Sequence, residues 1–144
     1  MGLEDVDAVA GALQLSIGLF LRRIRQVQGD GELTMPESSA LPRLDKFGPT
    51  TSSELARSEQ ISPQSMGATL GALEDRGLIE RRPDPTDGRR VVLSPTEAGV
   101  AVLRDRRDAR SARIAAALEA DFTAAERRKL MAAAPLIERL AHTI

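Results

Sequence analysis

Arginine side chains are frequent in the stretch between positions 76 and 90. Five arginines and three carboxylates give this stretch a charge of +2, in a chain whose total is −1: Arg76, Arg81, Arg82, Arg89 and Arg90 against Glu80, Asp84 and Asp87. The order Asp87-Gly88-Arg89, in a loop rich in proline and aspartate, places one arginine at a turn. An arginine at a loop tip suits the narrow minor groove of DNA, where the negative potential is enhanced. Taken alone, the pattern fits a solvated turn with a local ion pair even better.

The segment before the arginines, residues 63–76, predicts a helix with an unusual surface. At about 100° per residue, one side must face a core, and it carries Met66, Leu70, Leu73 and Gly77. The opposite side is made of small and mostly uncharged residues: Gln64, Ala68, Gly71 and Asp75, with Ser65 and Ala72 at its edges and Thr69 nearer the core. Gly67 and Gly71 each cost up to about 1 kcal/mol of helix stability relative to alanine. We interpret them as allowing another molecule to approach closely; the alternative is relief of packing against a neighbouring helix.

This helix is the second of a predicted pair. A capping box from Thr51 to Glu54 begins a short helix over residues 52–58. After a three-residue turn, the Ser62-Pro63 pair begins the second helix, which ends at Gly77. Two helices joined in this way are typical of a helix-turn-helix, which places its second helix in the major groove of DNA.

A β-hairpin is predicted directly after the second helix. Residues 78–82 and 90–93 read as two short strands around the arginine-bearing loop. A helix-turn-helix followed by such a hairpin is a winged helix, and this context favours DNA over a merely solvated turn. We therefore expect Arg81, Arg89 and Arg90 to contact DNA from the wing.

Longer helices are predicted on both sides of this lobe. Residues 3–28 carry apolar side chains in steps of three and four from Leu3 to Ile24, and Gly29-Asp30-Gly31 ends the run. Such a stripe is too long for one small core to cover. A shorter helix over 35–46 should kink or break at Pro42.

The C-terminal part of the chain predicts two more helices. One runs over residues 96–118, with Ser94 and Thr96 as capping residues before it, and the other runs over 124–141. The predicted fold class is thus mainly α with a small β wing. It is a single domain over 1–144, with a winged helix-turn-helix lobe at 34–94 and a connecting helix at 95–118. Residues 1–33 and 119–144 are the expected dimerisation helices.

Composition excludes several other classes of protein. The chain has no cysteine and one histidine, His142, so no thiolate metal site, disulfide or cofactor is expected. No arrangement of a catalytic triad, phosphate loop or metal cluster is visible, so we expect no enzyme. No apolar run approaches the roughly 18 residues of a membrane span, and the N-terminus does not resemble a secretory signal. We therefore expect a cytoplasmic location.

Several runs of the sequence resemble the MarR family of bacterial transcription regulators. They are Thr51-Ser-Ser-Glu-Leu-Ala, Ile61-Ser-Pro, Leu73-Glu-Asp-Arg-Gly-Leu-Ile-Glu-Arg, Asp84-Pro-Thr-Asp-Gly-Arg-Arg and Leu93-Ser-Pro-Thr-Glu-Ala-Gly. The resemblance covers nearly the whole chain, and the wing run with the run after it is its most specific part. It implies a dimer held by the N- and C-terminal helices, with residues 63–76 in the major groove and Arg89 in the minor groove. It also implies repression that a small, often aromatic, anionic ligand relieves.

The sequence departs from the family on the exposed side of the second helix. That side has no arginine or lysine, although the family often has a basic residue near Ala68. Base readout would then rest on Gln64, Ser65 and Thr69, with Ala68 against a thymine methyl group. We expect modest specificity from direct contacts and more from groove shape. Two other functions stay open: a weakly specific protein that coats DNA, and a winged-helix module that docks a protein instead. The lack of cysteine excludes the oxidation-sensing branch of the family.

Overall fold

The structure is a computed structural model that describes residues 5–27 and 33–144. The chain divides into two compact units, residues 28–108 and residues 1–27 with 109–144, so the boundary falls inside one long helix. That helix is α5 (Glu97–Asp121).

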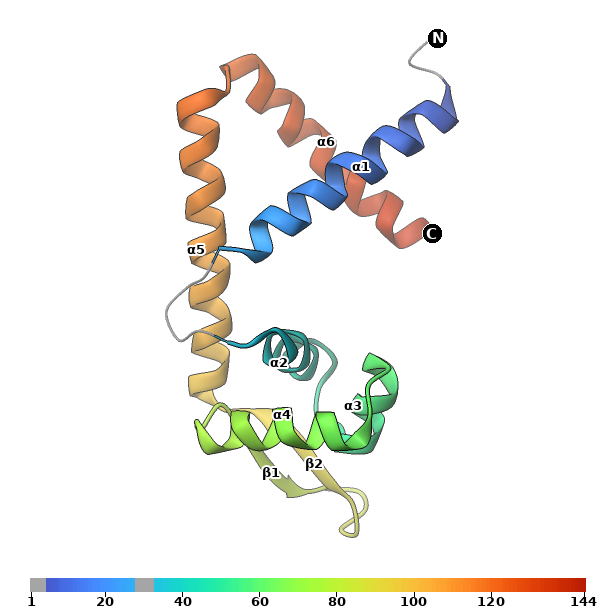
Figure 1. Ribbon diagram of the computed structural model, residues 1–144, viewed down its shortest axis with the longest axis vertical. Helices are drawn as coiled ribbons and strands as arrows, with labels where there is room; N and C mark the ends of the chain where they lie inside the picture. Colours follow the sequence, from blue (N-terminus) through green and yellow to red (C-terminus); the bar gives the residue numbers. More distant parts are fainter. Residues whose placement is uncertain (1–4, 28–32) are drawn as a thin grey trace. The chain divides into compact units, whose positions relative to one another are not determined.

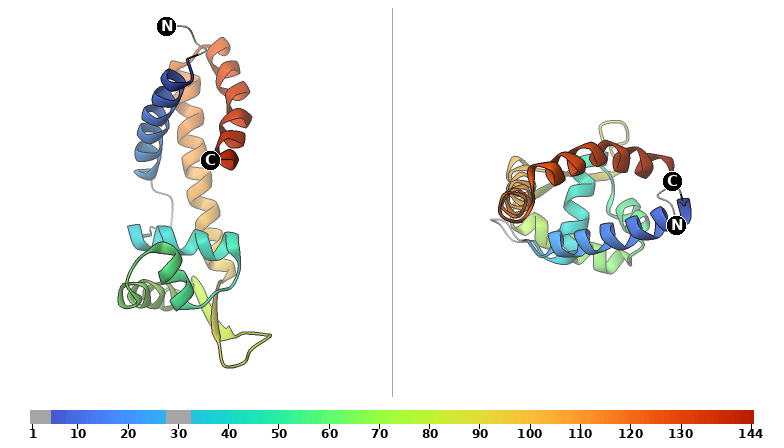
Figure 2. Two further views of the ribbon diagram at one scale, coloured as in Figure 1. Left: turned by 90° about the vertical axis from the view of Figure 1, so that its right-hand side faces the viewer. Right: turned by 90° about the horizontal axis from the view of Figure 1, so that it is seen from above.

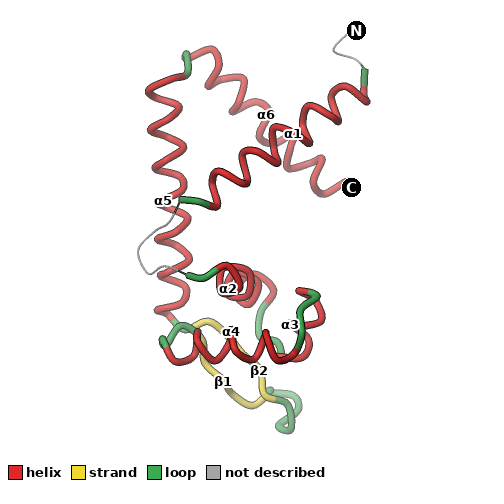
Figure 3. Tube along the Cα trace, viewed as in Figure 1, coloured by secondary structure: helices red, strands yellow, loops and turns green. Residues whose placement is uncertain are grey.

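The unit of residues 28–108 holds three helices, a two-stranded sheet and the start of α5 (Figure 1). The elements follow the order α2 (Met35–Phe47), α3 (Ser52–Glu59), α4 (Pro63–Asp75), β1 (Ile79–Pro83) and β2 (Val91–Pro95). The strands are antiparallel, with Ile79 opposite Pro95 and Pro83 opposite Val91. This is the predicted mainly α fold with a β wing, and Figure 3 shows the wing as the only strands among the described residues.

Leucine and methionine side chains from four elements form the core of this unit. The largest fully buried ones are Leu41, Leu44, Met66, Leu70, Leu73 and Leu93. Burying each such side chain is worth about 1.5–3 kcal/mol, so the core fixes α4 and the wing on one small scaffold. Three of the four residues predicted on the inner side of α4 are therefore confirmed.

Gly77 does not face the core, and that prediction was wrong. It is exposed, with φ of 73°, because it ends α4 instead of continuing it. Its N–H donates to the Glu74 carbonyl at 2.9 Å, and the Leu78 N–H donates to the Leu73 carbonyl at 3.0 Å. This pair of bonds is the Schellman motif, in which glycine supplies the left-handed residue after the helix.

Two further local predictions need correction. Of the kink or break predicted at Pro42, the break does not occur, because α2 continues through that residue. Ser94 caps no helix, because it lies buried in β2, where its hydroxyl accepts a hydrogen bond from Arg82 at 3.1 Å. Thr96 alone begins α5, and its hydroxyl accepts the Gly99 N–H at 3.1 Å.

The other unit consists of α1 (Val6–Arg25), α6 (Ala124–Thr143) and the second part of α5. Helices α1 and α6 cross in Figure 1 but lie apart in both views of Figure 2. Neither contains a buried residue, and Val6, Leu15, Met131 and Ile144 are each more than 75% exposed. Leu3 and Gly29-Asp30-Gly31, which we predicted at the ends of the first helix, lie outside the described residues.

No helix among the residues that the structure describes has the length and apolar character needed to cross a membrane.

Candidate nucleic-acid interface

The exposed side of α4 is the predicted DNA-reading surface. Gln64, Ser65 and Ala68 are exposed, and Thr69 is half-buried at the edge, as its angle on the helix predicted. The structure thus places the four predicted residues on one side of one helix.

The polar groups on this side differ in how much hydrogen-bonding capacity they have left. The Ser62 hydroxyl caps α4 by accepting the Ser65 N–H at 3.1 Å, and the two serine hydroxyls lie 3.0 Å apart. The Thr69 hydroxyl donates to the Ser65 carbonyl at 3.1 Å. Gln64 forms no side-chain hydrogen bond within the described part of the chain. Its amide is therefore the polar group most available to an external partner.

The turn between α3 and α4 holds an unusual backbone conformation. Gln60 has φ of 57° and ψ of 41°, in the left-handed region that favours glycine. Its N–H donates to the Arg57 carbonyl at 3.2 Å, and the Ile61 N–H donates to the Ala56 carbonyl at 3.1 Å. The angle between the two helices is thus set by a Schellman motif built without glycine.

The wing loop, residues 84–90, is fixed by its own aspartates. One Asp84 carboxylate oxygen accepts both the N–H and the hydroxyl of Thr86, each at 2.9 Å. These two bonds hold the pKa of Asp84 below its ordinary value. Asp87 accepts the Arg89 N–H at 3.1 Å, and its carbonyl accepts the Arg90 N–H at 3.0 Å. The loop is therefore ordered by internal hydrogen bonds.

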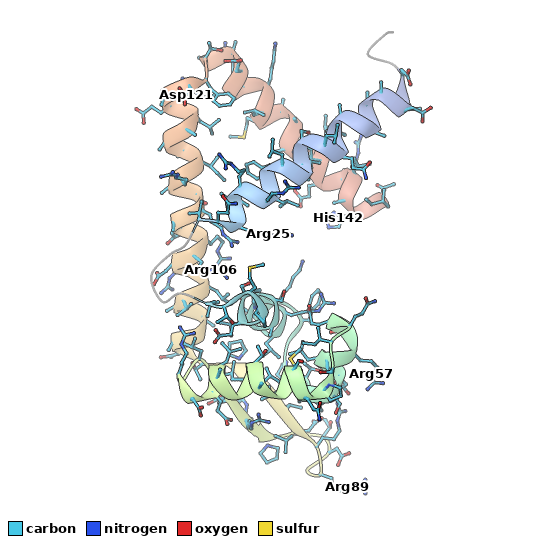
Figure 4. The ribbon with its side chains drawn as sticks, in the orientation of Figure 1. Arg25, Arg57, Arg89, Arg106, Asp121 and His142 are labelled. Carbon is cyan, nitrogen blue, oxygen red and sulfur yellow. The ribbon has the colours of Figure 1, made fainter. Side chains whose placement is uncertain are left out.

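The three predicted wing arginines have different surroundings. The Arg89 side chain is 94% exposed at the loop tip, where, within the described parts of the chain, it pairs only with Asp87, at 3.4 Å (Figure 4). Arg81 pairs with Glu74 of α4 at 2.9 Å. Arg90 pairs with Glu54 of α3 and lies 3.7 Å from Asp84. Arg89 alone thus extends its guanidinium into solvent, while Arg81 and Arg90 link the wing to the two helices.

One buried charge pair of this unit was not predicted from the sequence. Glu37 is only 3% exposed and pairs with Arg76, the cap of α4, at 3.0 Å. Burial alone would raise the pKa of Glu37, but hydrogen bonds from Thr34 and the charge of Arg76 hold it below its ordinary value. The spacing from Thr34 to Glu37 is that of a capping box. That signal could have identified the helix start, though not the pairing with a residue 39 positions away.

Comparison with known proteins identifies the family. The MarR family model matches residues 33–91. A helix-turn-helix-type transcriptional regulator of Mycobacterium bovis is 34% identical over 134 residues, which cover 92% of this chain and 93% of the relative. A helix-turn-helix-type transcriptional repressor of Mycobacterium tuberculosis is 34% identical over 105 residues, covering 72% of this chain and 75% of that one.

Solved structures of other proteins resemble this chain over nearly its whole length. A protein of Pseudomonas aeruginosa PA01 superposes with a TM-score of 0.78 at 29% identity, covering 98% of this chain and 99% of the other. A MarR family protein of Bacillus stearothermophilus shares the fold, with a TM-score of 0.73 at 19% identity over 99% and 97% of the two chains. With a helix-turn-helix, a wing and relatives named as transcription regulators, the chain belongs to the MarR family of DNA-binding transcription regulators.

Proposed function

We propose that the protein is a homodimeric repressor that recognises a specific double-stranded DNA sequence through α4 and the wing. One observation carries the proposal: the exposed small-residue side of α4 and the 94% exposed Arg89 side chain are carried by elements that share one hydrophobic core. Helix α4 is of a size to enter the major groove, and a tip arginine suits the adjacent minor groove.

Gln64 has the leading role in direct base readout. A free glutamine amide can bond adenine N6 and N7 together, a pairing worth about 1–3 kcal/mol of discrimination. Ser65 and Thr69 already use their hydroxyls within the helix, so they contribute contacts of lower specificity. Ala68 offers its methyl group to thymine. Arg89 adds affinity, and its contribution is larger where the minor groove is narrow, because a narrow minor groove attracts cations.

The apolar surface of α1 and α6 supports the proposed dimer. Both helices lack buried residues, and both expose large apolar side chains, among them Leu15, Leu19 and Leu136. Apolar surface of this kind often marks a protein–protein interface. A second copy of residues 1–33 and 119–144 would cover them. Light scattering should give twice the 15.5 kDa chain mass, about 31 kDa. A mass of one chain at micromolar concentration would contradict the dimer.

An effector that relieves repression is the remaining part of the proposal. A MepR-like protein, 28% identical with a TM-score of 0.51, has been crystallised in complex with pseudoligands. A small aromatic anion such as benzoate is a suitable first probe. Adding benzoate should lower the affinity of the protein for DNA. The regulator is proposed to act in the cytoplasm, so the measurement uses a buffer that resembles it.

The proposal is tested with variants of the two surfaces. Fluorescence anisotropy compares the duplex upstream of the protein's own gene with a scrambled duplex. Gln64→Ala should weaken binding to the first duplex about tenfold and leave the second unchanged. Arg89→Ala should weaken both, and Arg104→Ala, an exposed arginine of α5, should change neither. Equal loss on both duplexes for Gln64→Ala would favour a weakly specific DNA-coating protein. Absence of DNA binding in the wild type would favour a protein-docking module.

A further inference from the structure

The wing is attached to the start of α3 at two places, one in β2 and one at Arg90, the loop residue that precedes β2. The first is a backbone bridge, in which the Leu93 N–H donates to the Thr50 carbonyl at 2.8 Å and the Thr50 N–H donates to the Leu93 carbonyl at 3.4 Å. The second is the pairing of Arg90 with Glu54. Arg90 lies three residues before Leu93, so the two attachments are at most about 10 Å apart along the chain.

Three charged side chains make the second attachment, and we call them the Arg90 cluster: Arg90, Glu54 and Asp84. Glu54 is itself held, since it accepts the Thr50 hydroxyl at 2.6 Å and its N–H donates to the Thr51 hydroxyl at 3.1 Å. Across the loop, Asp84 donates its N–H to the Arg90 carbonyl at 2.9 Å. The Arg90 guanidinium thus lies between α3 and the opposite arm of the wing loop.

The Thr50–Leu93 bridge and the Arg81–Glu74 pair hold the wing at one level, because Arg81 lies opposite Leu93 in the sheet. With these two alone, the part of the wing beyond them could swing, and Arg89 at the tip would move furthest. The Arg90 cluster removes that freedom and leaves Arg89 as the extended cation. We propose that Arg90 is a positioning residue, which holds the wing through Glu54 and Asp84 so that Arg89 meets the minor groove while α4 occupies the major groove. The inference rests on the proposed function.

The alternative is that Arg90 binds a DNA phosphate directly, and the variant Glu54→Gln distinguishes the two. Glutamine keeps the capping box of α3 but removes the charge that holds Arg90. If Arg90 bound phosphate, this variant would release it and remove a repulsive carboxylate, so DNA affinity would rise. If Arg90 positions the wing, affinity falls instead.

The experiment measures anisotropy on the duplex upstream of the protein's own gene, for Glu54→Gln and Arg90→Gln in the wild type and in the Arg89→Ala background. We expect each to weaken binding two- to fivefold in the wild type, the range of exposed ion pairs. Neither should weaken it further once Arg89 is absent, because the cluster acts through that residue. Unchanged or tighter DNA binding by Glu54→Gln would overturn the inference. So would a loss of DNA affinity that is as large in the Arg89→Ala background as in the wild type.

Hydrogen exchange provides a readout without DNA. The Asp84 amide, bonded across the loop, should exchange faster in Glu54→Gln, whereas the Leu78 amide at the end of α4 should not change. Equal Asp84 exchange in both proteins would overturn the inference. If the wild type bound no duplex at all, the proposed function would fail, and this exchange result would still decide whether the cluster fixes the wing.

Discussion

Gly99 lies where α5 passes closest to the end of α4, and alanine there should be strongly destabilising. A Cβ atom on residue 99 would stand 2.1 Å from the Leu78 carbonyl oxygen and 3.1 Å from its carbon. That carbonyl also accepts the Thr96 N–H at 3.0 Å, and the Thr96 hydroxyl donates to the Gly77 carbonyl at 2.6 Å. The obstacle is therefore backbone held by two hydrogen bonds, which cannot move aside like a flexible side chain.

Two opposing effects determine how much Gly99→Ala changes the free energy of unfolding. Alanine in a helix gains up to about 1 kcal/mol over glycine, and overpacking of a well-packed site costs typically 1–3 kcal/mol and occasionally more. A contact this short lies at the upper end, so we expect Gly99→Ala to lower the free energy of unfolding by about 2–3 kcal/mol net. In a chain of this size that lowers Tm by about 8–12 °C.

Thermal and urea denaturation followed by circular dichroism measure the loss, with Gly67→Ala as the matched control. Gly67 also lies in a helix, but a Cβ there would meet nothing within 4 Å. The control should raise stability by about 0.5–1 kcal/mol. Similar stability changes in the two variants would refute the assigned close approach of α5 to Leu78.

Three other predictions concern the same lobe. Gly71→Ala should raise Tm, because an added Cβ would meet nothing within 4 Å. The same variant should weaken DNA binding, because its methyl group enters the surface proposed to face DNA. Unchanged affinity would show that DNA does not approach this surface closely. Gln60→Gly should raise the free energy of unfolding by about 0.5–1 kcal/mol, measured by urea denaturation, because glycine relieves the strain of the positive φ. A lower free energy of unfolding in this variant would mean that the turn is unstrained. The pKa values of Glu37, Glu54 and Asp84 are lowered in the folded protein. The stability that these carboxylates contribute is therefore complete above their pKa values in the unfolded chain, 4.5 for the glutamates and 3.8 for the aspartate. It is lost as the pH falls through their lower pKa values in the folded protein. Tm should be flat from pH 7 to about 5.5 and fall below that; a fall beginning near neutral pH would contradict it.

Local signals explain why so much of the lobe could be predicted. The capping boxes of α3 and α6 and the Ser62-Pro63 start of α4 lie within four residues of the helix ends that they set, and each boundary agrees with the structure to within about two residues. The inner side of α4 followed from helical periodicity alone. The prediction for Gly77 was wrong because the periodicity was extended two residues beyond Asp75, where α4 ends.

The remaining features depend on pairs far apart in the sequence. Arg90 and Glu54 are 36 positions apart, and nothing in either local pattern indicates that they meet. The same holds for Glu37 with Arg76 and for Gly99 with Leu78. Ser94 had a local capping pattern, but its burial against Arg82 in the sheet prevailed. Tertiary packing thus decided which arginines of the wing extend into solvent.

The central claim is that α4 and the wing recognise a particular DNA sequence. The most direct test is the ratio of affinities of the wild-type protein for the duplex upstream of its own gene and for a scrambled duplex, at about 150 mM salt, because phosphate contacts alone are strongly salt-dependent. We predict a preference of about a thousandfold or more, as specific regulators show. Equal, weak and salt-sensitive binding to both duplexes would contradict the claim.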